Sequence, residues 1–145
     1  MSSGLNVDMN KLFFIISILI FSITGCDKSH NCKIPDGVYT GTFQRQLAFG
    51  GGDTAKVTLT FSSNTWTGFS DKPHYPALCN GTYVIDRQKI IFTNECVWTA
   101  DFDGSLILGG EYTFTLDGNK LGIIRDDRGP SRDTYVDIYK LTKQE

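Results

Sequence analysis

The chain has 145 residues, of which 14 are Lys or Arg and 16 are Asp or Glu, so its formal net charge is −2. No cluster of basic residues suggests a surface that follows phosphates, which excludes nucleic acid as an expected partner. The four cysteines form no CxxC motif, and the two histidines, His30 and His74, are far apart in the sequence. A metal site is therefore not expected either.

The N-terminal segment has the layout of a secretory signal. Lys11 precedes a nearly unbroken apolar run over residues 12–23. As a helix, this run would reach about 18 Å, well short of the ~30 Å hydrocarbon core of a membrane. It ends in Ile23-Thr-Gly-Cys26, which resembles a lipobox. We therefore predict a lipoprotein signal peptide over residues 1–25, lipid attachment at the Cys26 thiol and cleavage just before it. The alternative is an ordinary secretory signal in which Cys26 is incidental.

The start of the chain and the segment after the signal can also be predicted. Met9 would open the signal with Met-Asn-Lys, whereas Met1 adds the acidic Asp8, so Met9 is the expected start and Met1 the alternative. Residues 26–36 are polar and lack periodicity, and we expect a tether there. The mature protein would then be lipid-anchored to a membrane of the bacterial cell envelope, on the periplasmic side or at the cell surface.

Residues 37–145 are predicted to form one all-β domain. Val57, Leu59 and Phe61 alternate with polar residues, the period-two pattern of strands with one buried face. The expected strands are residues 37–44, 55–62, 65–70, 81–86, 89–93, 96–102, 105–108, 110–116, 120–125 and 133–141. Short turns such as Ser63-Asn64 and Arg87-Gln88 connect them. We expect an antiparallel meander of about eight to ten strands that closes into a barrel, because closure removes exposed strand edges.

A family resemblance supports this fold. The opening strand Gly37-Val-Tyr-Thr-Gly-Thr-Phe43, an expected glycine-rich loop over residues 49–53, the meander and the lipobox together resemble the lipocalin-like small lipoproteins of Bacteroidota. The resemblance covers most of residues 37–141. It implies a lipocalin-like, eight-stranded barrel with room for a small cavity, and it does not supply a ligand.

Cys79 and Cys96 are predicted to form a disulfide. They are equidistant from a two-residue turn at Arg87-Gln88, which would place them directly opposite each other across the hairpin. Opposed Cβ atoms in such a pair are about 4.5–5.5 Å apart, close to what a disulfide requires. The bond would leave Cys32 free; the alternative is a pair of reduced, buried cysteines.

Aromatic residues expected to face the barrel interior are the candidate ligand-binding residues. Trp98 and Phe102 join this group because they share parity with Cys96 in the expected strand 96–102. The full set is Tyr39, Trp66, Tyr83, Trp98, Phe102 and Tyr112. Such an interior could hold one small apolar ligand, or the same side chains could simply fill the core.

The sequence offers no nucleophile with a plausible base, so we expect neither an enzyme nor a cofactor. Two functional hypotheses remain open. The first is binding of a small apolar ligand inside the barrel, and the second is binding of an envelope protein, as by an inhibitor of an envelope-directed enzyme. An open aromatic cavity would favour the first; a filled interior with a prominent loop rim would favour the second.

Overall fold

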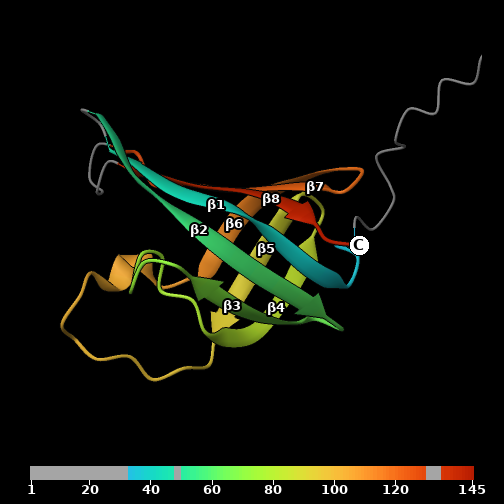
Figure 1. Ribbon diagram of the computed structural model, residues 1–145, viewed down its shortest axis with the longest axis horizontal. Coiled ribbons are helices and arrows are strands. Elements are labelled where there is room, and N and C mark those ends of the chain that lie inside the picture. The colour runs from blue at the N-terminus through green and yellow to red at the C-terminus, as the bar shows by residue number, and fades with distance from the viewer. Residues whose placement is uncertain (1–32, 48–49, 130–134) are drawn as a thin grey trace, which may run out of the picture. The chain divides into compact units, whose positions relative to one another are not determined.

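The computed structural model describes residues 33–47, 50–129 and 135–145, so Cys26, Cys32 and the predicted signal lie outside the described residues. Within the compact unit Asn31–Glu145, the described residues form eight strands in a closed barrel (Figure 1). The strands are β1 (Gly37–Leu47), β2 (Gly50–Ser62), β3 (Thr65–Ser70), β4 (Asn80–Asp86), β5 (Lys89–Asn94), β6 (Gly110–Asp117), β7 (Lys120–Asp126) and β8 (Tyr135–Lys143). Each strand pairs antiparallel with the next, and β8 pairs with β1. The predicted all-β meander and its closure are confirmed.

The two ends of the barrel are connected differently. At the turn end, two-residue turns join β2 to β3, β4 to β5 and β6 to β7. Asn64 and Gly118 have φ values of 72° and 57° in these turns, which Asn and Gly adopt more readily than other residues. At the loop end, the longer segments 71–79 and 95–109 join β3 to β4 and β5 to β6. This end lies to the left in Figure 1.

The described chain enters the barrel at the turn end. Ile34 is fully buried there, and the Pro35 carbonyl accepts a hydrogen bond of 2.9 Å from the Tyr39 hydroxyl. The last residues of the predicted tether therefore pack against the barrel, because one apolar side chain in this polar segment reaches the core.

Aromatic side chains fill the barrel interior. Phe61 packs edge to face on Tyr39 and Tyr83, with ring centroids 5.5 and 5.3 Å apart. Phe92 packs in the same way on Trp66 and Tyr112, at 5.7 and 5.6 Å. Such contacts add to the free energy gained by burying these large rings. The core is thus an interlocked set of rings drawn from six strands.

β1 and β8 approach closely where the barrel closes. A Cβ atom at Gly41 would lie 1.9 Å from the Lys140 carbonyl oxygen and 2.9 Å from the Leu141 Cα atom. Only glycine fits this position without moving the backbone. The second glycine of the opening strand is therefore required by the closure of the barrel.

Three sequence expectations are wrong. Residues 96–102 and 105–108 are not strands but belong to the segment 95–109, which contains one short 3₁₀ helix, η1 (Gly104–Leu106). The Asn94 side chain ends β5 by accepting a hydrogen bond from the Cys96 amide, and Asp103 caps η1 by accepting one from the Ser105 amide. In the glycine-rich segment, residues 50–53 are part of β2 rather than a loop.

Candidate functional site

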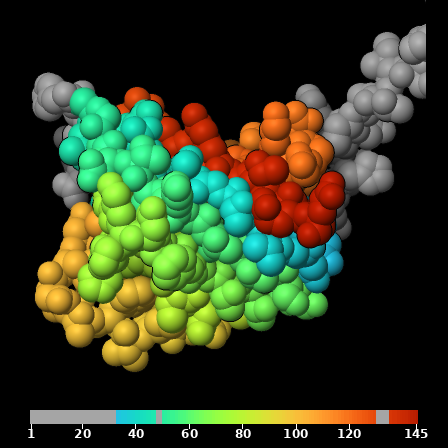
Figure 2. Space-filling view, viewed as in Figure 1, coloured from blue at the N-terminus to red at the C-terminus, as the bar shows by residue number. Residues whose placement is uncertain are grey.

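The two long connections at the loop end form one surface, which we call the loop cap (residues 71–79 and 95–109). Ala77 and Ile107 form a parallel bridge. Beside it, the Ala77 amide donates to the Leu106 carbonyl at 3.0 Å, and the Leu108 amide donates to the Ala77 carbonyl at 3.1 Å. Figure 2 shows the yellow-green and gold atoms of the two connections in contact.

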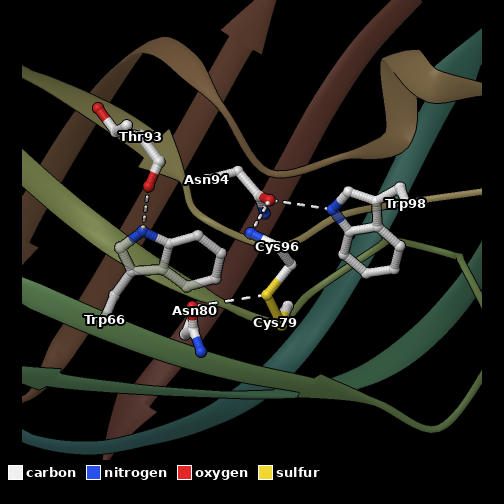
Figure 3. Close-up of a disulfide and its surroundings, with 7 residues drawn as sticks. All are labelled: Trp66, Cys79, Asn80, Thr93, Asn94, Cys96 and Trp98. Carbon is white, nitrogen blue, oxygen red and sulfur yellow. Dashed lines mark hydrogen bonds between the residues drawn. A yellow bond between two sulfur atoms is a disulfide. The ribbon is translucent and has the colours of Figure 1, made fainter.

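The Cys79–Cys96 disulfide also joins the two parts of the loop cap, with the Cα atoms 6.4 Å apart (Figure 3). The predicted bond is confirmed, as is the turn that led to it, because Tyr83 pairs with Phe92 as expected. The ladder itself ends at Gly81–Asn94, so the cysteines lie just beyond it and not directly across it. They are partly exposed at the loop end of the barrel.

Three aromatic side chains gather on the loop cap. His74 stacks on Phe102 with ring centroids 4.1 Å apart, and Trp98 meets Phe102 and His74 edge to face at 5.6 and 5.9 Å. The Trp98 indole donates to Asn94 Oδ1 at 2.9 Å, the same oxygen that accepts from the Cys96 amide. All three rings are partly exposed, and Val97 beside them is fully exposed.

The six candidate ligand-binding residues therefore divide into two groups. Tyr39, Trp66, Tyr83 and Tyr112 lie inside the barrel with exposed fractions of 0–3% and belong to its hydrophobic core. Trp98 and Phe102 do not face the interior, because their segment leaves the barrel wall after Asn94. The structure brings them together with His74, which was not among the candidate residues.

The loop cap also closes the mouth of the barrel. Tyr75 packs edge to face on Phe43 at 5.2 Å, and its hydroxyl donates to the Asp53 carbonyl at 2.9 Å. Leu106 and Leu108 pack against the same core from the other connection. Apolar side chains from both parts of the cap thus extend the core to the loop end.

Three ionised side chains form a row beneath the cap. Asp137 on β8 lies between its two strand neighbours, Arg45 on β1 and Arg125 on β7. Arg45 Nε and Nη2 donate to the two carboxylate oxygens of Asp137 at 2.7 and 2.8 Å, and Arg125 Nη2 donates to Oδ2 at 2.7 Å. Arg45 and Asp137 are only 6% and 2% exposed. We call these three residues the arginine row.

The arginine row holds the loop cap from inside. The Ser105 carbonyl accepts hydrogen bonds from Nη2 of Arg45 at 3.0 Å and from Nη2 of Arg125 at 2.7 Å. Arg45 Nη1 also donates to the Ser105 hydroxyl at 2.7 Å and to Asp103 Oδ2 at 3.1 Å. Charge-assisted hydrogen bonds of this kind are stronger than neutral ones. The segment 95–109 is therefore fixed to strands that are distant from it in sequence.

Charge interactions favour the ionised forms of Arg45 and Asp103. Burial lowers the pKa of Arg45, but the hydrogen bond and charge of Asp137 outweigh this effect, so the Arg45 pKa is raised. Hydrogen bonds from Ser105 and the charges of Arg45 and Arg125 lower the pKa of Asp103. The guanidinium of Arg45 also stacks on the Tyr135 ring at 3.8 Å, which adds a cation–π contact.

Sequence reasoning missed the arginine row, although a signal was present. Arg45, Arg125 and Asp137 each occupy an inward position, two residues from Phe43, Ile123 and Tyr139 respectively. A charged side chain at an inward position of a strand must find a partner, because an unpaired buried charge is costly. The alternation of inward and outward positions could have identified the three residues as inward-facing, but it could not have predicted that they pair with one another.

Comparison with known proteins finds no matching family model, no matching curated protein and no matching solved structure. Kinship with the lipocalin-like lipoproteins therefore stays a prediction from the strand pattern and the lipobox. Among the described residues, no helix is long and apolar enough to cross a membrane. Within those same ranges, no group of three or more His, Cys, Asp or Glu side chains is placed to hold a metal ion.

Proposed function

We propose that this protein is a non-catalytic lipoprotein of the bacterial cell envelope that binds another protein through its loop cap. The observation that carries the proposal is the placement of the aromatic side chains. The rings inside the barrel are tightly packed, whereas Trp98, Phe102 and His74 form a partly exposed cluster outside it. A filled interior with a prominent loop rim favours protein binding over ligand storage.

The path of the chain supports a loop cap that faces away from the membrane. The described chain enters at the turn end, where Ile34 is buried, and the loop cap lies at the opposite end. Cys26 is seven positions before Lys33, a distance of at most about 25 Å when extended. A lipid on Cys26 would hold the turn end near the membrane and leave the loop cap accessible to partners.

The aromatic composition and the fixed conformation of the loop cap suit recognition of a protein. Trp and other aromatic residues are enriched among the residues that carry binding energy at interfaces. The disulfide, the Ala77–Ile107 bridge and the arginine row fix both connections. Because the loops are already ordered, binding costs less conformational entropy than it would for free loops.

Binding of a small apolar ligand in the interior is the less favoured alternative. Such a ligand would have to displace rings that are in edge-to-face contact at 5.3–5.7 Å. Native mass spectrometry of protein purified from its own host tests this alternative. A retained small molecule that is lost when Trp66 or Tyr83 is substituted would favour interior binding over the loop cap.

The anchor is tested by substituting the proposed acceptor thiol. Cys26→Ser should abolish labelling with palmitate and block signal cleavage, because no other atom there accepts the lipid. Cys32→Ser is the matched control and should keep both properties. A Cys26→Ser variant that still labels and still fractionates with membranes would contradict lipid anchoring.

Protein binding is tested by site-specific photo-crosslinking in cells that produce the full chain. A photoreactive phenylalanine analogue at Val97 should give a discrete adduct with another protein. The same analogue at Val84, which is exposed on the outer wall of β4, is the control and should give none. Absence of any adduct at Val97, or equal adducts at both positions, would overturn binding through the loop cap.

A further inference from the structure

The loop cap carries mainly negative charge. The segment 95–109 contains Glu95, Asp101 and Asp103 but neither Lys nor Arg. In the segment 71–79, Asp71 accompanies a single Lys72, and that ammonium is engaged by Asp53 at 3.0 Å. The cap therefore presents carboxylates around its aromatic cluster with little basic charge to balance them.

Two of these carboxylates are not neutralised by any salt bridge among the described residues. Asp103 contacts the buried Arg45 at 3.1 Å, whereas Glu95 and Asp101 are exposed and have no cationic partner in the ranges that the structure describes. Both lie within three positions of Trp98 in the sequence. A hydrogen bond from Thr99 lowers the pKa of Asp101, so this carboxylate stays charged at neutral pH.

The turn end differs from the loop cap in its pattern of charged residues. Acidic and basic residues alternate there, as in Asp86-Arg87-Gln-Lys89 and Asp117-Gly-Asn-Lys120. Lys89 also pairs with Glu111 at 2.7 Å. The electrostatic potentials of neighbouring positive and negative charges cancel over short distances. The carboxylates of the loop cap are all negative, so their potentials add and act together on an approaching molecule. The negative charge thus coincides with the exposed aromatic cluster.

We infer that the partner of the loop cap is a protein whose contact surface is rich in Lys and Arg. This inference rests on the proposed function and specifies the chemistry of the partner. The rings of Trp98 and Phe102 would supply the apolar centre of the interface, and Glu95 and Asp101 would form its acidic rim. Complementary charges at a rim accelerate association and select among partners. Arg side chains of the partner can also stack on the exposed indole of Trp98.

The test uses the adduct at Val97 in the full chain, with charges changed in pairs. Glu95→Lys/Asp101→Lys should reduce the adduct yield about tenfold, since reversal makes two rim contacts repulsive. Asp86→Lys/Glu145→Lys applies the same change of net charge at the turn end and should leave the yield within about twofold. Recovery of the Cys79–Cys96 peptide from each variant without reduction shows that the loop cap has formed.

The outcomes separate this inference from the proposed function. An adduct that persists unchanged in Glu95→Lys/Asp101→Lys would overturn the basic partner and leave protein binding intact. Absence of an adduct in the unaltered chain would overturn both. Mass spectrometry of the adduct gives an independent readout. A crosslinked partner peptide on a surface rich in Lys and Arg supports the inference, and one on an acidic surface contradicts it.

Discussion

Arg45 and Asp137 lie 92 positions apart in the chain and face each other directly across the β1–β8 seam. Two hydrogen bonds of 2.7 and 2.8 Å join the guanidinium to the carboxylate in parallel. The pair forms only when the last strand returns to the first. It therefore links closure of the barrel to the position of the loop cap, which rests on the same guanidinium through Ser105.

Removal of the shared carboxylate should be strongly destabilising. Asp137→Asn removes the buried carboxylate that Arg45 and Arg125 share and leaves them only their more exposed partners, Asp103 and Asp127. Breaking a buried ion pair in this way costs up to about 3–5 kcal/mol. Chemical denaturation should show this loss of unfolding free energy. Asp126→Asn, which breaks the exposed pair with Arg128, is the control and should have little effect. Equal stability of the two variants would contradict a structural role for the arginine row.

The Cys79–Cys96 disulfide should contribute substantially to stability. Cys79→Ala/Cys96→Ala should lower the unfolding free energy by roughly 2–4 kcal/mol, because the unfolded chain gains freedom. For a domain near this size, the melting temperature would fall by several degrees to over ten degrees. Peptide mapping without reduction checks the pairing, and Cys32 should react with a thiol reagent in the folded protein. A Cys32–Cys79 or Cys32–Cys96 peptide would contradict the assignment.

Acid should weaken the attachment of the loop cap through Asp103. Because its folded-state pKa is lowered, ionised Asp103 stabilises the fold above its unfolded pKa of about 3.9. This contribution is lost as the pH falls from there through the folded value. The difference in melting temperature between the wild type and Asp103→Asn should therefore be present at pH 7 and shrink as the pH falls below about 3.9. A difference that does not change with pH would show that the Asp103 charge has no role.

The buried tyrosines should resist ionisation in alkali. Burial raises the pKa of Tyr112 and of Tyr139, so the fold is fully stabilised by these neutral hydroxyls below pH ~10 and loses this stability as the pH rises further. Ultraviolet titration should show the two residues ionising only when the barrel unfolds, and Tyr112→Phe should remove one late-titrating group. Ionisation near pH 10 in the folded protein would indicate a water-filled interior instead of a packed one.

Local patterns in the sequence were enough to predict much of the barrel. Alternation of apolar and polar residues located the strands, and Arg87-Gln88 set the register that pairs Tyr83 with Phe92. The same register brought Cys79 near Cys96, because residues equidistant from a tight turn stay close even past the end of the ladder. These relationships involve residues that are close together in the sequence, so local sequence patterns are enough to predict them.

The candidate site depended on contacts that the sequence does not display. The alternation continues through Trp98 and Phe102, but the Asn94 side chain ends β5 before them, so both rings lie on the loop cap and not in the core. The inward positions of Arg45, Arg125 and Asp137 followed from alternation, whereas their pairing required β8 to lie between β7 and β1. Within the strands, the sequence thus determined which face each side chain occupies. Only the closed barrel decided which side chains meet, because partners far apart in the chain are chosen by strand register and closure.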